Sequence, residues 1–159
     1  MTALNTDINR VFETPSTSNA IPVAEGARIY QDALVGKNAA GYGRPLQAGD
    51  TPMGFAKDHI DNTNGVDGEK ICELKAKGKA SLFISGITIA DIGRAVYASD
   101  DNTFTLTDAD NSLVGKLVRF EKSDYGIVAF DFLASIESHT GAAASASASM
   151  DNPDEDDGE

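Results

Sequence analysis

The 159-residue chain has one cysteine, two histidines, no tryptophan and 7% aromatic residues. With Cys72 alone, an intramolecular disulfide is impossible, and this cysteine usage weakly indicates a reducing compartment during folding. His59 and His139 are far apart in the sequence, so together with one cysteine they do not make a zinc site. Because aromatic side chains are scarce, aliphatic and small side chains must fill most of the core.

Positive charge is also scarce, with 13 Lys and Arg against 25 Asp and Glu and a net charge of −12. A protein that binds nucleic acid neutralises phosphates with a basic surface, and an anionic membrane surface attracts basic segments. We therefore expect neither nucleic acid nor a membrane as a partner. Six of the acidic residues lie within residues 151–159, and residues 1–150 carry a net charge of only −6.

Long apolar runs are absent from the sequence. Residues 1–20 lack the apolar stretch of a signal peptide, and no segment approaches the 18 or so apolar residues that span a bilayer. We expect a soluble protein made in the cytoplasm.

Composition divides the chain into three parts. Residues 1–20 are polar and rich in Thr, Asn and Ser, which predicts an extended N-terminal arm. Residues 138–159 contain the run GAAASASAS and the acidic end DNPDEDDGE, which predict a flexible tail, since they offer almost nothing to bury. Residues 21–137 form the expected β-rich domain.

Short apolar runs separated by Gly, Asn and Asp pairs fill this domain, as is typical of strands joined by tight turns. The predicted strands are 27–31, 33–37, 51–57, 70–77, 79–85, 94–98, 103–107, 112–121 and 125–134. Many short strands without intervening helices predict a mainly β fold, a small β-barrel or sandwich.

Alternation of side chains predicts which of them face the core. Val128, Phe130 and Phe132 share one face of their strand, while Ala129 and Asp131 share the other. The predicted core residues are Leu82, Phe83, Val96, Leu117, Val128, Phe130 and Phe132.

Three local features complete this prediction. Val114, Val118 and Phe120 are expected on one face of their strand, which Lys116 interrupts. The sequence Lys-Gly-Lys at 77–79 is expected to turn a hairpin. A helical turn is expected over 88–92, with Thr88 as its cap.

No recurrent catalytic pattern is found in the sequence. Cys72 alternates in phase with Leu74 and Ala76, so it is expected in the core rather than as a nucleophile. The oxygen-rich residues 58–69 do not have the spacing of a calcium loop and are interpreted as a surface turn, although an irregular calcium loop stays open. No catalytic, cofactor-binding or metal-binding residue is assigned, and we expect the protein not to be an enzyme.

The order of several segments resembles the capsid cement (head decoration) proteins of tailed phages. These segments are residues 26–35 (GARIYQDALV), 53–56 (MGFA), 61–63 (DNT), 90–107 (ADIGRAVYASDDNTFTLT), 111–115 (NSLVG) and 128–131 (VAFD). The resemblance covers about residues 24–134, and its motifs are strands and turns without a catalytic signature.

This resemblance implies a virion structural protein on the outer surface of the capsid. Its partners would be the major capsid protein and copies of itself, commonly in a homotrimer, and it would stabilise the expanded head. Residues 1–20 are expected to order on a neighbouring subunit, with Val11 and Phe12 as the contacts. A β-rich binding module, such as a host-surface adhesin that uses the loop 58–69, is the alternative. An enzyme with an unrecognised site is a third possibility.

Overall fold

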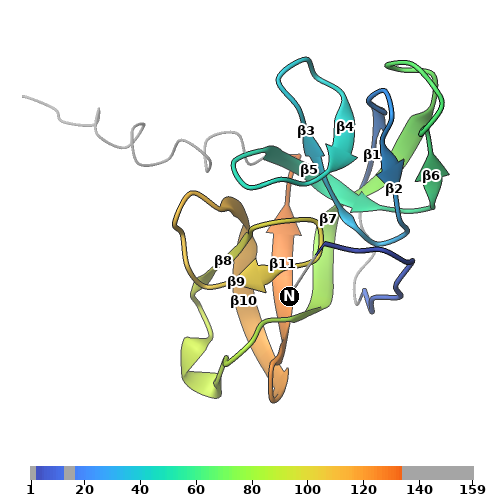
Figure 1. Ribbon diagram of the computed structural model, residues 1–159. Coiled ribbons are helices and arrows are strands. Elements are labelled where there is room, and N and C mark those ends of the chain that lie inside the picture. The colour runs from blue at the N-terminus through green and yellow to red at the C-terminus, as the bar shows by residue number, and fades with distance from the viewer. Residues whose placement is uncertain (1–2, 13–16, 134–159) are drawn as a thin grey trace, which may run out of the picture.

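The computed structural model describes residues 3–12 and 17–133. The predicted tail, residues 138–159, lies outside the described residues, as does part of the predicted arm. The described chain is mainly β, which confirms the predicted class (Figure 1). Its elements are β1 (Thr17–Pro22), β2 (Arg28–Ile29), β3 (Leu34–Lys37), β4 (Gly43–Pro45), β5 (Thr51–Ala56), β6 (Ile60–Asp61), β7 (Ile71–Phe83), the 3₁₀-helix η1 (Ile89–Asp91), β8 (Ala95–Ala98), β9 (Phe104–Thr105), β10 (Ser112–Lys122) and β11 (Tyr125–Asp131). The described residues include no helix long and apolar enough to cross a membrane.

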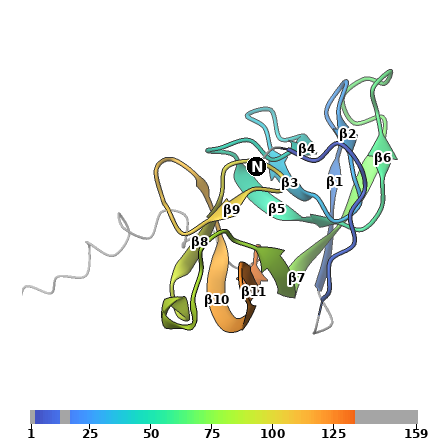
Figure 2. The ribbon, with the colours of Figure 1, turned by 60° about the horizontal axis from the view of Figure 1, so that its bottom comes forward.

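One strongly curled sheet forms most of the domain (Figures 1 and 2). Its strand order is β4-β3-β5-β7-β11-β10-β8-β9, with β1 paired to β7, and β2 and β6 form a separate two-stranded sheet. Parallel bridges join Val23 to Gly43 and Ile84 to Phe104. Each end strand of the sheet, β4 and β9, is therefore bridged to another part of the chain. The curl gives a half-barrel around the apolar side chains.

The 13-residue strand β7 lies at the centre of this sheet, and it corrects one prediction. The expected hairpin turn at 77–79 is wrong, because β7 continues through Gly78. Here Gly78 has a φ of 154°, a conformation that residues with a side chain rarely adopt, and it lets the strand coil. The ladder to β11 runs unbroken from Lys77 to Phe83, and a local turn would lose these hydrogen bonds.

Three strands were not expected from the sequence: β1, β4 and β6. Thr17–Ala20 belong to the expected arm, yet they pair with β7 as part of β1. Their side chains are mostly exposed, so pairing of the backbone, rather than burial, holds them in the sheet. The expected helical turn is confirmed as η1, where the Thr88 hydroxyl accepts a hydrogen bond from the N–H of Ala90.

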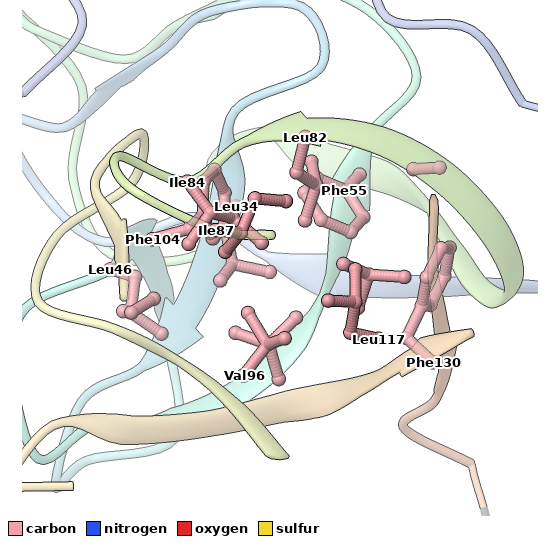
Figure 3. Close-up of a cluster of buried hydrophobic side chains, with 14 residues drawn as sticks. Leu34, Leu46, Phe55, Leu82, Ile84, Ile87, Val96, Phe104, Leu117 and Phe130 are labelled. Atoms are coloured by element: carbon pink, nitrogen blue, oxygen red, sulfur yellow. The ribbon is translucent and has the colours of Figure 1, made fainter. Parts of the chain in front are cut away.

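Two clusters of buried side chains fill the curl. The larger includes Leu34, Phe55, Leu82, Val96, Phe104, Leu117, Val128 and Phe130 (Figure 3). The smaller includes Ile21, Val23, Ile29, Val35, Ala56, Cys72 and Leu74. Strand β7 supplies both clusters, with Cys72 and Leu74 in the smaller one and Ala80 and Leu82 in the larger.

Of the predicted core residues, five are fully buried: Leu82, Val96, Leu117, Val128 and Phe130. Phe132 is partly buried against the larger cluster. The prediction for Phe83 is wrong, because alternation along β7 turns Leu82 inward and Phe83 outward, with 36% of Phe83 exposed.

Register shifts in β10 correct one residue of its expected core face: Val114 is buried and Phe120 is partly buried against the larger cluster, as predicted, but Val118 is not. The pairing shifts between Leu113 and Gly115 and again between Leu117 and Arg119. The second shift places Val118 outside, so Leu117 points inward while Val118, predicted on the core face, is 39% exposed. The same shifts place Lys116 outside, where its charge remains in water.

Adjacent substitutions at Leu117 and Val118 test this register. Leu117→Ala should lower the free energy of unfolding by about 2–5 kcal/mol, because it leaves a cavity in the larger cluster. Val118→Ala should change it by no more than about 0.5 kcal/mol, since that side chain lies at the surface. Urea unfolding followed by circular dichroism gives both values, and equal losses would contradict the bulged register.

Candidate partner-binding surface

The N-terminal segment, residues 3–12, continues the pairing of β1 along the edge of β7. The N–H of Ser81 donates to the carbonyl of Val11 at 3.0 Å, and Phe12 forms a bridge with Ala80. Because neighbouring residues of a strand point to opposite faces, these two contacts turn Phe12 and Val11 in opposite directions. The ring of Phe12 packs edge-on against Phe55, while 63% of Val11 is exposed.

The two predicted contact residues, Val11 and Phe12, therefore have different surroundings. Phe12 contacts the core of its own domain, with its ring centroid 6.5 Å from that of Phe130. Val11 is available to a partner. Whether either residue touches a capsid or a second subunit stays a prediction.

Arg10 anchors the segment in a polar cage at the end of the larger cluster. Its backbone N–H donates to Oδ2 of Asp32 at 3.0 Å, and its guanidinium donates to the Asp32 carbonyl and to Oδ1 of Asn102. The guanidinium carbon also lies 5.5 Å from the ring centroid of Phe55 and 5.2 Å from that of Phe104. Burial lowers the pKa of Arg10 to about 10, so the side chain remains charged at neutral pH.

The acids of the cage are buried as well. The carboxylate of Asp32, a residue 1% exposed, accepts from Nζ of Lys75 at 3.0 Å. The carboxylate of Asp101, also 1% exposed, accepts from the N–H of Leu4 at 3.0 Å. Burial raises the pKa of Asp101 to about 6, the charge of Asp100 adds to this, and the Leu4 N–H and Arg10 oppose it.

The side of β7, β11 and β10 that faces away from the core carries the candidate surface, here called the outer face. The ladder from β7 to β11 pairs Lys77 with Asp131, Lys79 with Ala129, Ser81 with Ile127 and Phe83 with Tyr125. The ladder from β11 to β10 pairs Ala129 with Lys116, Ile127 with Arg119 and Tyr125 with Lys122. Of these residues, Ile127 is fully buried. Val11 joins this face beside Ser81.

A groove of mixed polar and apolar lining lies at one end of the outer face. It has a volume of about 510 Å³ and is lined by Asn9, Arg10, Val11, Ser81, Glu121, Lys122 and Tyr125. Phe83 and Tyr125 stack edge-on beside it, with ring centroids 5.3 Å apart, and each is 36% exposed. Exposed aromatic and aliphatic side chains with charged and polar neighbours are typical of a protein-binding surface.

A basic end, formed by Lys77, Lys79 and Lys116, adjoins the groove on the same face. The basic side chains of the outer face are Lys77, Lys79, Lys116, Arg119 and Lys122, five of the 13 in the chain. Sequence reasoning missed this surface. The alternation of Lys77 and Lys79 is its signal in the sequence, but the turn expected at 77–79 concealed the side that they share.

The loop 58–69, the contact surface of the alternative reading, is held by Asn62. This side chain is buried and its Nδ2 donates to the carbonyls of Ala24 and Val66 at 2.9 and 3.0 Å. A Cβ at Gly65 would collide with Oδ1 of Asn62, which explains the glycine. Val66 is 62% exposed at the loop surface.

The side chains of this loop are held by local hydrogen bonds and an ion pair, as in an ordinary surface turn. Hydrogen bonds from Thr63, aided by the Arg28 guanidinium 2.9 Å away, hold the pKa of Asp61 well below its usual range. Within the described ranges, no three His, Cys, Asp or Glu side chains are grouped so that they could hold a metal ion.

Cys72 is fully buried, as expected from its alternation with Leu74 and Ala76. Burial raises the pKa of its thiol to about 12, with the charges of Asp58 and Glu73 adding to the effect. The thiolate needed for nucleophilic attack is therefore scarce at neutral pH.

Comparison with known proteins gives no match: no family model fits the chain, and neither a curated protein nor a solved structure is similar to it.

The raised pKa of Asp101 predicts a pH-dependent contribution to stability. The unfolded chain loses this proton near pH 4 and the folded chain near pH 6, so between these values the folded state binds more protons and stability falls as pH rises. Asp101→Asn removes this loss and keeps an acceptor for Leu4. Relative to the wild type, the variant should gain about 1–3 kcal/mol of unfolding free energy between pH 4 and pH 7.

Urea unfolding at both pH values measures this gain, with the exposed Asp108→Asn as the control for a lost surface charge. A difference between Asp101→Asn and wild type that stays constant from pH 4 to pH 7 would show that Asp101 titrates normally.

Proposed function

We propose that the protein is a non-enzymatic structural protein of a tailed-phage virion that binds the outer surface of the capsid and stabilises the expanded head as a trimer. The major capsid protein is its partner. The order of the segments that resemble capsid cement proteins supports this proposal, since these segments form strands and turns from β2 to β11 of one domain.

The position of Val11 carries the proposal. The Arg10 cage and the Phe12 ring hold the N-terminal segment on the domain, and this presents Val11 beside the groove and near the Phe83–Tyr125 pair. An apolar side chain that is 63% exposed on an anchored backbone gains by burial against a partner and loses little conformational entropy on binding.

The mechanism requires no chemical step. A protein that binds the expanded lattice better than other states shifts the equilibrium toward that lattice. Many sites on one head, with each trimer contacting several capsid subunits, add through multivalency. Ile89 in η1 and Ile92 at its end, 70% and 44% exposed, offer apolar area for contacts between copies.

Co-sedimentation of the purified chain with expanded heads that lack it tests this function. The chain should bind saturably, and Val11→Asp should weaken binding at least about tenfold, because a charge in the apolar contact must be desolvated. The melting temperature should not change, since the Val11 side chain faces solvent in the free protein.

Val66→Asp is the matched control, with the same substitution at a side chain equally exposed but in the loop 58–69. Its binding to heads should equal that of the wild type. Absence of saturable binding to heads would overturn the proposal. Binding to host cells that is lost in Val66→Asp and kept in Val11→Asp would establish the adhesin instead.

A further inference from the structure

A basic surface stands out in a chain with a net charge of −12. Lys79 and Lys116 flank Ala129 in one row of the outer face, and Lys77 precedes them along β7. Because the side chain of Ala129 is small, the surface between the two lysines is hollow. A groove of about 490 Å³ lies there, lined by Thr17, Lys77, Gly78, Lys79, Ala129, Phe130 and Asp131.

The charges of this basic end are poorly compensated. The distance from Nζ of Lys77 to the Asp131 carboxylate is 3.8 Å, and both side chains are well exposed, so this pair is weak. Among the described residues, neither Lys79 nor Lys116 forms an ion pair. Like charges brought together by the ladder repel one another, and an anionic occupant would relieve this repulsion.

The chain itself contains a strongly acidic segment, and the described part of the chain ends close to this surface. Strand β11 ends at Asp131, beside Lys77, and the described chain ends two residues later. Residues 151–159 (DNPDEDDGE) contain six acidic side chains and no basic one. The connecting residues 134–150 span up to about 55 Å, whereas the outer face from Asp131 to Tyr125 is only about 20 Å long.

We propose that the acidic segment 151–159 of each chain binds the basic end of its own outer face, over Lys77, Lys79 and Lys116. A tether of this length holds the segment at an effective concentration on the order of millimolar, enough for weak ion pairs to act together. The segment thereby covers charges that would otherwise attract other anionic surfaces. This inference does not depend on the proposed function, since it concerns the free protein.

A spin label near the tail tests the contact in the full-length chain. Ser149→Cys introduces the label site, and the buried Cys72 thiol, with a pKa of about 12, stays unmodified. Paramagnetic relaxation should remove about half of the amide signal intensity at Lys79, Lys116 and Ala129 in low salt. The signals should recover near 0.5 M NaCl, where the Debye length is only about 4 Å.

Two double substitutions, each of which removes two positive charges, provide the test and its matched control. Lys79→Gln with Lys116→Gln should abolish the relaxation at the outer face. Lys37→Gln with Lys70→Gln makes the same change of charge away from this face and should leave the relaxation as in the parent protein.

Three outcomes would overturn the proposal. The relaxation could be spread evenly over the domain, or the two lysine double variants could lose it equally. It could also appear only between labelled and unlabelled copies and decline on dilution. The last would assign the acidic segment to a neighbouring molecule. None of these measurements needs capsids, so failure here is distinct from failure of the proposed function.

Discussion

The fold depends on one constraint, the continuity of β7 through Gly78. Within 13 residues this strand pairs with β1, β5 and β11, receives the N-terminal segment at Ala80 and Ser81, and supplies both buried clusters. A positive φ at Gly78 lets the strand coil without a break in its ladder to β11, so the sheet curls around its side chains. One backbone position that only glycine occupies readily thus contributes to the curvature that encloses a core poor in aromatic residues.

The N-terminal segment uses the same strand for a different purpose. Its backbone pairs with the edge of β7, which turns Phe12 toward the rings of Phe55 and Phe130 and leaves Val11 outside. The partly buried Arg10 is satisfied by Asp32, Asn102 and two aromatic faces, so its desolvation is compensated by partners fixed in the fold. An exposed apolar side chain is therefore presented from a well-anchored backbone, as a contact residue requires.

Net charge is a poor guide to the surface of this protein. Six of the 25 acidic residues lie in residues 151–159, whereas strand pairing gathers five of the 13 basic side chains on the outer face. The groove beside Val11 and this basic end lie side by side on three adjacent strands. Both binding proposals therefore concern one face, and a partner that reached across its whole length would compete with the acidic segment there.

The sequence by itself determined the features that depend on neighbouring residues. The mainly β class, the capped turn at Thr88, the alternation of Val128 and Phe130 and the burial of Cys72 follow from local periodicity and turn chemistry, and they agree with the structure. Of the candidate surface, the sequence indicated only Val11, without its orientation. The tertiary structure decided the strand through Gly78, the outward turn of Val118 and the common side of Lys79 and Lys116. These depend on hydrogen bonds between strands far apart in the chain, and one shift of register moves a side chain from core to solvent without any change in local pattern.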